Sequence, residues 1–194
     1  MKKIYFCILL LGACIGSLYA EDIAQSGDLY FGIETWNGTA YVMQDESYKS
    51  LTEVTIPSTV EYDGQTYTVD RIGSYAFYGC QSLTTVAMAN TITSIGYEAF
   101  KECENLSSIT FSNTLTGIDS YAFESCSSLT DITLPSTVKN IGDGAFRWSK
   151  KLRSINIPEG VSRLNYDTFS DCQSLTTITL PSSLTEIANY VFNQ

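Results

Sequence analysis

Leu129 to Lys151 reads LTDITLPSTVKNIGDGAFRWSKK, and these 23 residues are one copy of a unit that repeats along most of the chain. A phenylalanine marks each copy at a constant spacing, a branched apolar residue precedes it by five positions, and leucine follows it by six in every unit but the last. The markers are Phe77, Phe100, Phe123, Phe146, Phe169 and Phe192. Because a fixed period of about 20 to 50 residues is typical of stacked repeats, the sequence predicts a solenoid.

The interior of the unit predicts one strand and a non-helical return. Apolar and small polar residues alternate in the first third, the pattern of a half-buried strand. Pro135, Pro158 and Pro181 follow and end the strand, since proline cannot donate to a strand ladder. The remaining dozen or so residues are too few for a full helix with its connections, so we expect irregular or short helical returns.

Two segments depart from the period. Leu51 to Leu83 holds nine residues more than a regular unit, and we place this insertion at about 61–69, as a β-hairpin that turns at Asp63-Gly64. Residues 30–43 alternate around Asn37-Gly38 and predict a second hairpin, so we interpret 21–50 as an N-terminal β-hairpin cap on the solenoid of residues 51–194.

The last unit is incomplete and is expected to lack a cap. It begins at Leu175 and stops at Gln194, three residues short of a full coil, which leaves its apolar residues without a neighbouring coil. Two interpretations remain open. Either the chain is a fragment or truncated array, or it self-associates end to end through this C-terminal coil.

The first 20 residues predict a secretory signal peptide. Lys2 and Lys3 precede an apolar run over 4–11, and small residues lead to a cleavage site after Ala20. The competing interpretation is a lipoprotein signal, because residues 11–14 resemble a lipobox in which Cys14 would be lipidated. Both place the protein outside the cytoplasm, secreted or at the cell surface.

Composition narrows the function. Removing residues 1–20 takes away two lysines and leaves 9 basic against 21 acidic residues, a net charge of about −12, which argues against nucleic acid and anionic lipid partners. The chain has no histidine and no Gly-rich phosphate loop, and no second apolar run reaches the ~20 residues of a membrane span. We therefore expect no catalytic activity, no cofactor, no metal and no transmembrane segment.

The repeated residues resemble the BspA and Treponema type of leucine-rich repeat, a family of bacterial surface proteins. The match runs from Leu51 to Gln194, and departures include Ser149 at a cysteine position and Leu164-Asn165 at an Ile-Gly position. The resemblance implies a curved α/β-type solenoid of 23-residue coils, with a parallel β-sheet on one face. It also implies export and adhesion to host matrix proteins or other cells, and it supplies no catalytic residues.

Four cysteines fall three positions after the repeat phenylalanine, at Cys80, Cys103, Cys126 and Cys172. We interpret them as buried thiols that fill space, because in-register side chains are too far apart for undistorted disulfides and no histidine completes a metal site.

The outward strand positions are the candidate ligand-binding residues, at Thr85, Ser108, Thr110, Asp131, Thr133, Ser154, Asn156, Thr177 and Thr179. They predict a flat, hydroxyl-rich face that lacks aromatic and arginine anchors, so a solvated sheet face is the plainer interpretation. Tyrosines two or three positions before the phenylalanine form an outer stripe or pack over neighbouring coils. Trp36 and Trp148 are further contact candidates, with capping and core filling as alternatives.

The sequence therefore favours a non-catalytic protein that binds a protein or glycan ligand, through its sheet face or its projecting hairpin. End-to-end assembly through the last coil, or a truncated array, is the alternative.

Overall fold

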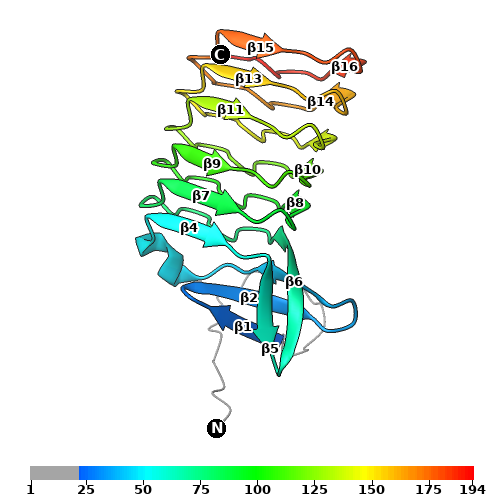
Figure 1. Cartoon of the computed structure of the whole chain (residues 1–194). Coiled ribbons are helices and arrows are strands. Elements are labelled where there is room, and N and C mark those ends of the chain that lie inside the picture. The colour runs from blue at the N-terminus through cyan, green and yellow to red at the C-terminus, as the bar shows by residue number, and fades with distance from the viewer. Residues whose placement is uncertain (1–21) are drawn as a thin grey trace, which may run out of the picture.

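The computed structural model describes residues 22–194, which form a stack of coils with the N-terminal region at one end (Figure 1). The predicted signal peptide and the lipidation candidate Cys14 lie outside the described residues. Each coil contributes one main strand and a second strand, which has two residues in every coil but the first. The main strands are β4 (Glu53–Ile56), β7 (Thr85–Met88), β9 (Ser108–Thr110), β11 (Asp131–Thr133), β13 (Ser154–Asn156) and β15 (Thr177–Thr179).

The main strands pair in parallel and in register, as the family resemblance implies. They form two three-stranded sheets, β4-β7-β9 and β11-β13-β15. Ile132 lies opposite Ile155, and Ile155 opposite Ile178, so each step along the sheet advances one repeat. Side chains alternate between core and solvent. We call the solvent side of these six strands the strand face.

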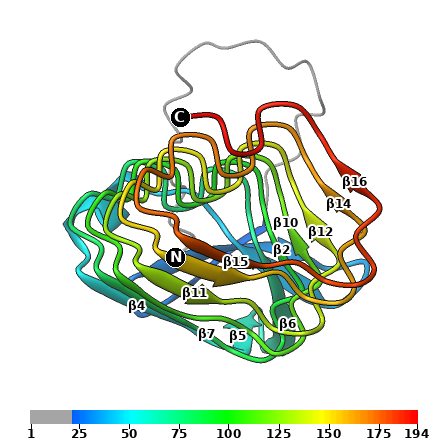
Figure 2. The same ribbon diagram turned by 90° about the horizontal axis from the view of Figure 1, so that it is seen from above.

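The returns contain a second ladder that the sequence analysis does not predict. It consists of β8 (Ser94–Ile95), β10 (Gly117–Ile118), β12 (Asn140–Ile141), β14 (Arg163–Leu164) and β16 (Glu186–Ile187), with β8 pairing on the longer β6 (Gln65–Ile72). Viewed along the stack, these strands line the side next to the main strands, and turns fill the remainder of the coil (Figure 2). Within residues 22–194 the only helix is the 3-10 helix η1 (Glu46–Ser50).

Gly142, directly after β12, permits a close contact between two coils. A Cβ atom on Gly142 would lie 2.3 Å from the backbone nitrogen of Ser120 in the preceding coil, well inside van der Waals contact. Gly73 and Gly96 occupy the same position of the repeat, whereas Asp119, Asn165 and Ala188 occupy it in the other coils.

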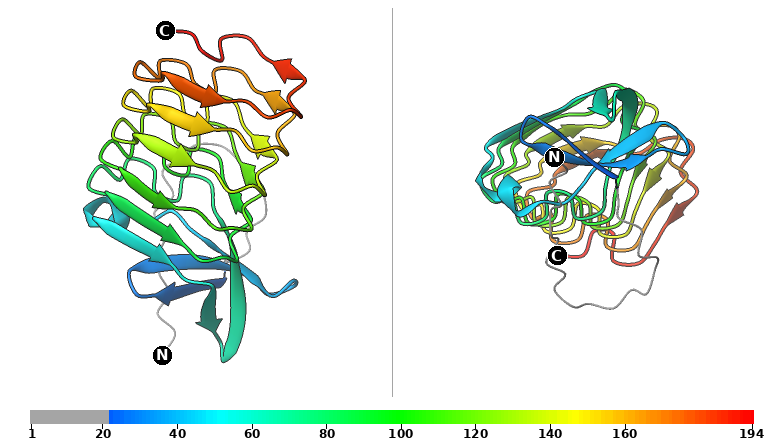
Figure 3. Two further views of the ribbon diagram at one scale, coloured as in Figure 1. Left: turned by 45° about the horizontal axis from the view of Figure 1, so that its top comes forward. Right: turned by 90° about the horizontal axis from the view of Figure 1, so that it is seen from below.

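The N-terminal region joins the same ladder. β1 (Asp22–Ser26), β2 (Leu29–Glu34) and β3 (Thr39–Val42) form an antiparallel meander, and β3 pairs in parallel with β6. β5 (Thr59–Tyr62) and β6 form a hairpin that projects past the end of the stack (Figures 1 and 3). Its turn residues Asp63 and Gly64 both have positive φ, 49° and 74°, as a two-residue hairpin turn requires.

An ion pair ties this region to the first coil. The Arg71 guanidinium donates to both carboxylate oxygens of Glu34, at 2.6 and 3.1 Å, and stacks 4.6 Å from the ring of Tyr41. This bidentate hydrogen bond lowers the pKa of Glu34.

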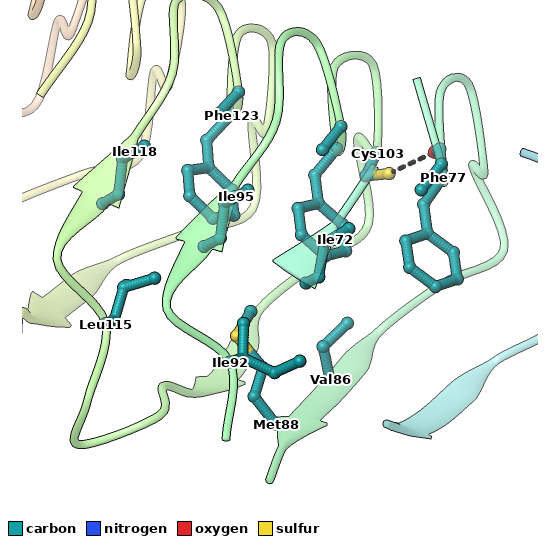
Figure 4. Close-up of a cluster of buried hydrophobic side chains, with 14 of the residues drawn as sticks. Ile72, Phe77, Val86, Met88, Ile92, Ile95, Cys103, Leu115, Ile118 and Phe123 are labelled. Atoms are coloured by element: carbon teal, nitrogen blue, oxygen red, sulfur yellow. Dashed lines mark hydrogen bonds between the residues drawn. The ribbon is translucent and has the colours of Figure 1, made fainter. Parts of the chain in front are cut away.

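The repeat phenylalanines form a continuous ladder through the core. Successive rings are stacked, with interplanar angles of 1° to 8° and centroid separations of 5.1 to 5.9 Å. Tyr48 of η1 lies 5.2 Å from Phe77 at the N-terminal end of the ladder. Phe77 and Phe123 pack beside Ile72, Ile95 and Ile118 of the second ladder (Figure 4).

The cysteines are buried and free, in agreement with the space-filling interpretation. They also make a regular hydrogen bond. The Sγ of Cys103 donates to the carbonyl of Phe77 in the preceding coil, at 3.0 Å, and Cys126 and Cys172 make the same contact at 3.1 Å (Figure 4). Ser149 replaces cysteine in this position and donates to the Phe123 carbonyl at 3.3 Å.

Candidate ligand-binding surfaces

The predicted binding residues lie in rows on the strand face. Asp131, Ser154 and Thr177 face one another across β11, β13 and β15, and Thr133, Asn156 and Thr179 form the next row. Thr85 and Ser108 align on β7 and β9, and Thr110 lies opposite Ala87. All nine side chains are exposed or half-buried. The structure therefore brings them together on one surface, as the strand register requires.

The strand face holds a hydrogen-bonded carboxylate and hydroxyls that are free to contact a ligand. Asp131 accepts from the Ser154 hydroxyl at 2.7 Å and from Arg153 at 3.2 Å, and these contacts lower its pKa. The side chains of Thr110 and Thr133, in contrast, hydrogen-bond to no other residue in the range 22–194. Their hydroxyls are available to a ligand.

The tyrosines of the returns form an outer row. They are both an exposed stripe and packed over neighbouring coils, the two arrangements that the sequence left open. Tyr75 contacts Tyr97 edge-on at 5.4 Å, Tyr97 contacts Tyr121 at 5.9 Å, and Tyr166 contacts Tyr190 at 5.3 Å. Most of these rings remain exposed while packing over the neighbouring coil. Gly144 interrupts the row, because a Cβ atom there would lie 2.5 Å from the ring of Tyr121.

The two tryptophans lie on the surface. Trp36 is 81% exposed in the turn between β2 and β3, so it neither caps nor fills the core. Trp148 is 39% exposed, and its indole Nε1 donates to Asp171 at 2.9 Å while the Arg147 guanidinium stacks 4.4 Å from its ring. Core filling by Trp148 is therefore wrong, because the phenylalanine ladder already occupies the interior.

A shallow groove of about 370 Å³ surrounds Trp148. It crosses four successive coils and is lined by Glu104, Ser125, Ser127, Trp148, Lys150, Asp171 and Gln173. Sequence reasoning named Trp148 alone, because the other lining residues lie far apart in the chain. The usable signal is their position in the repeat, two or four residues after the phenylalanine.

The last coil presents an apolar surface. Leu180, Ile187 and Phe192 are 42%, 50% and 43% exposed. Phe169 and Phe192 also line a smaller groove of about 210 Å³ beside the end of the ladder.

No group of three or more histidine, cysteine, aspartate or glutamate residues between positions 22 and 194 is placed to hold a metal ion. In the same range no helix has the length and apolar character of a membrane span.

The stacked 23-residue coils, with one main strand per repeat, define a leucine-rich repeat solenoid. The chain belongs to the BspA type leucine-rich repeat family, whose model matches six copies over residues 70–194. A search of curated protein sequences finds no match. Leucine-rich repeat proteins generally bind other proteins.

Solved structures support the same assignment. A leucine-rich cell surface protein from Faecalibacterium prausnitzii A2-165 is 32% identical, with a TM-score of 0.78 over 88% of this chain and 46% of that protein. A leucine-rich repeat protein from Bacteroides capillosus is 37% identical, with a TM-score of 0.63 over 70% of this chain and 97% of that protein. A leucine-rich repeat protein from T. pallidum is 27% identical, with a TM-score of 0.65 over 84% of this chain and 85% of that protein. The chain thus spans about half the length of the F. prausnitzii protein.

Proposed function

We propose that this chain is an exported, non-catalytic adhesion protein that binds a protein ligand through its strand face. The observation that carries the proposal is the set of aligned, exposed residues on the strand face, where hydroxyls such as those of Thr110 and Thr133 have no hydrogen-bond partner within residues 22–194. Family membership and the F. prausnitzii cell surface protein support a location outside the cell. The signal peptide predicted over residues 1–20 would direct export. In the alternative interpretation, lipidation of Cys14 would anchor the protein to a membrane.

The composition of the strand face indicates the kind of contact. It offers no aromatic side chain among the nine predicted residues, and aromatic and arginine anchors dominate compact binding hot spots. The contact is therefore extended, with many small polar contributions, and it needs a ligand long enough to cross several coils. Extracellular matrix proteins are the ligand class that we would test first.

The test is binding of residues 21–194 to an array of purified extracellular matrix proteins. A variant with Thr110, Asp131, Thr133 and Asn156 all changed to alanine should lose saturable binding, because it removes side chains from both rows. A matched variant, Glu61→Ala with Thr66→Ala, alters the projecting hairpin, where the Thr66 hydroxyl donates to the Glu61 carboxylate at 2.6 Å. Loss of binding in the hairpin variant alone would refute the strand face as the binding surface.

A second candidate function is end-to-end assembly through the last coil. The exposed side chains of Leu180, Ile187 and Phe192 favour it, since grouped apolar residues on a surface are typical of interaction sites. Sedimentation at increasing concentration tests this candidate. Assembly that disappears in Ile187→Glu would support it, and a monomer at every concentration would refute it.

A further inference from the structure

The groove around Trp148 is a second surface that the proposed function does not use. Its lining residues occupy two rows of the repeat, two and four positions after the phenylalanine, and they precede the main strands in each coil. Its volume of about 370 Å³ falls near the lower end of the ~300–1,000 Å³ typical of small-ligand sites.

Trp148 departs from what the repeat requires at this position. The equivalent residues in other coils are Gly79, Glu102, Ser125 and Asp171, and all of them, like Trp148, have a positive φ between 57° and 67°. This left-handed backbone disfavours bulky side chains. An exposed tryptophan that fills no part of the core, in a conformation that suits glycine, points to a role on the surface.

Several polar side chains of the groove are free to contact a ligand. The side chains of Glu104, Lys150 and Gln173 form no hydrogen bond or ion pair with any part of the chain that the structure describes. The charged lining residues are two carboxylates, Glu104 and Asp171, and one ammonium, Lys150; Arg147, stacked on the indole, pairs with Asp167 at 3.8 Å outside the lining. Donors and acceptors therefore surround an aromatic ring, with an excess of one negative charge.

We propose that this groove binds a neutral saccharide. The C–H face of a pyranose ring carries partial positive charge and would stack on the exposed part of the Trp148 indole, on the face that the Arg147 guanidinium does not cover. The hydroxyls of the same ring both donate and accept, which suits the Glu104 carboxylate, the Lys150 ammonium and the Gln173 amide together. Because the groove crosses successive coils, it also has room for a linked second sugar.

Other ligands suit the groove less well. An apolar peptide side chain would find one aromatic ring and no aliphatic pocket, and an anion would meet the Glu104 and Asp171 carboxylates. The saccharide site is independent of the strand face in both residues and ligand class, so neither proposal depends on the other.

The two tryptophans make the test direct. In Trp36→Phe, Trp148 is the sole indole and its fluorescence reports on the groove. The full chain of residues 21–194 is titrated with glucose, galactose, mannose, N-acetylglucosamine and their β-linked disaccharides, up to about 10 mM, well above a millimolar Kd. We expect a saturable change in emission with at least one sugar. No change with any of them, in a protein with a native circular dichroism spectrum, would overturn the proposal.

Three variants locate the site. Gln173→Ala, added to Trp36→Phe, should weaken binding about tenfold, because an exposed amide is removed without disturbing the core. Trp148→Gly should abolish binding measured by calorimetry, and Gly79 shows that glycine suits this backbone position. Thr133→Ala on the strand face should leave the Kd unchanged. An unchanged Kd in both groove variants would place the sugar elsewhere and refute the groove as the site.

Discussion

Replacing Phe123 by alanine should lower the free energy of unfolding by about 3 to 5 kcal/mol. Phe123 is fully buried and stacks between Phe100, at 5.2 Å, and Phe146, at 5.5 Å, with Phe111 edge-on at 6.0 Å. The substitution removes a large apolar side chain and leaves a cavity between coils. It also removes ring contacts worth about 0.5 to 1.5 kcal/mol each beyond their buried area.

The matched control lies at the end of the same ladder. Phe192 contacts one ring, Phe169 at 5.9 Å, and is 43% exposed, so Phe192→Ala should cost about 1 to 2 kcal/mol. Urea denaturation followed by circular dichroism compares the two variants. A cost below about 1 kcal/mol for Phe123→Ala, or equal costs for both variants, would show that the phenylalanine ladder does not hold the coils together.

Three further predictions concern contacts around the ladder. Arg71→Ala should cost about 1 to 2 kcal/mol at neutral pH. The ion pair lowers the folded-state pKa of Glu34 below its ordinary 4.5, so this contribution is present above that pH and disappears as acid protonates the folded carboxylate. Urea denaturation at decreasing pH should therefore show the unfolding free energies of the wild-type protein and the variant converging. Cys126→Ser should cost at most about 1 kcal/mol in urea denaturation, because Ser149 makes the same hydrogen bond elsewhere in the array, and alanine should cost more. Tyr48→Phe should cost about 1 to 2 kcal/mol by the same assay, because its buried hydroxyl accepts from a backbone amide at 2.6 Å.

The cysteines also predict a chemical behaviour. Burial raises the pKa of Cys80 to about 11 and that of Cys172 to about 12, and it raises the pKa of Cys126 well above its ordinary value. A thiol reagent should therefore leave the folded protein unmodified at neutral pH and react when urea unfolds it. Rapid modification of the folded protein would show that the coils open at this position.

The fold was predictable because the repeat encodes burial directly. Alternation around Ile132 gives a strand, the fixed step to Ile155 gives the register, and proline marks the end of the strand. The second ladder was not predictable in the same way. A strand of two residues, such as Asn140–Ile141, is too short to show a period, and it exists because the neighbouring coil supplies its partners.

The two candidate binding surfaces also differ in how far the sequence predicts them. The strand face could be predicted because its residues recur at one position of the unit. The groove residues also recur, two and four positions after the phenylalanine, but these positions have no alternation that marks them as one surface, and the sequence does not show that Trp148 contacts Asp171 across coils. Trp148 was recognisable as an unusual residue, but the sequence alone left open whether its side chain points into the core or lies on the surface.

The repeat constrains the two surfaces differently. On the strand face the backbone is fixed by the ladder, so a ligand can be distinguished only through the side chains in each row, such as Asp131 beside Ser154. Two residues after the phenylalanine, the backbone turns outward in a left-handed conformation, and residues as different as Gly79 and Trp148 occupy it without altering the stack. Because the coils do not depend on the side chain at this position, a substitution there changes the surface alone. A new binding site can therefore arise in a single coil while the coils keep their packing.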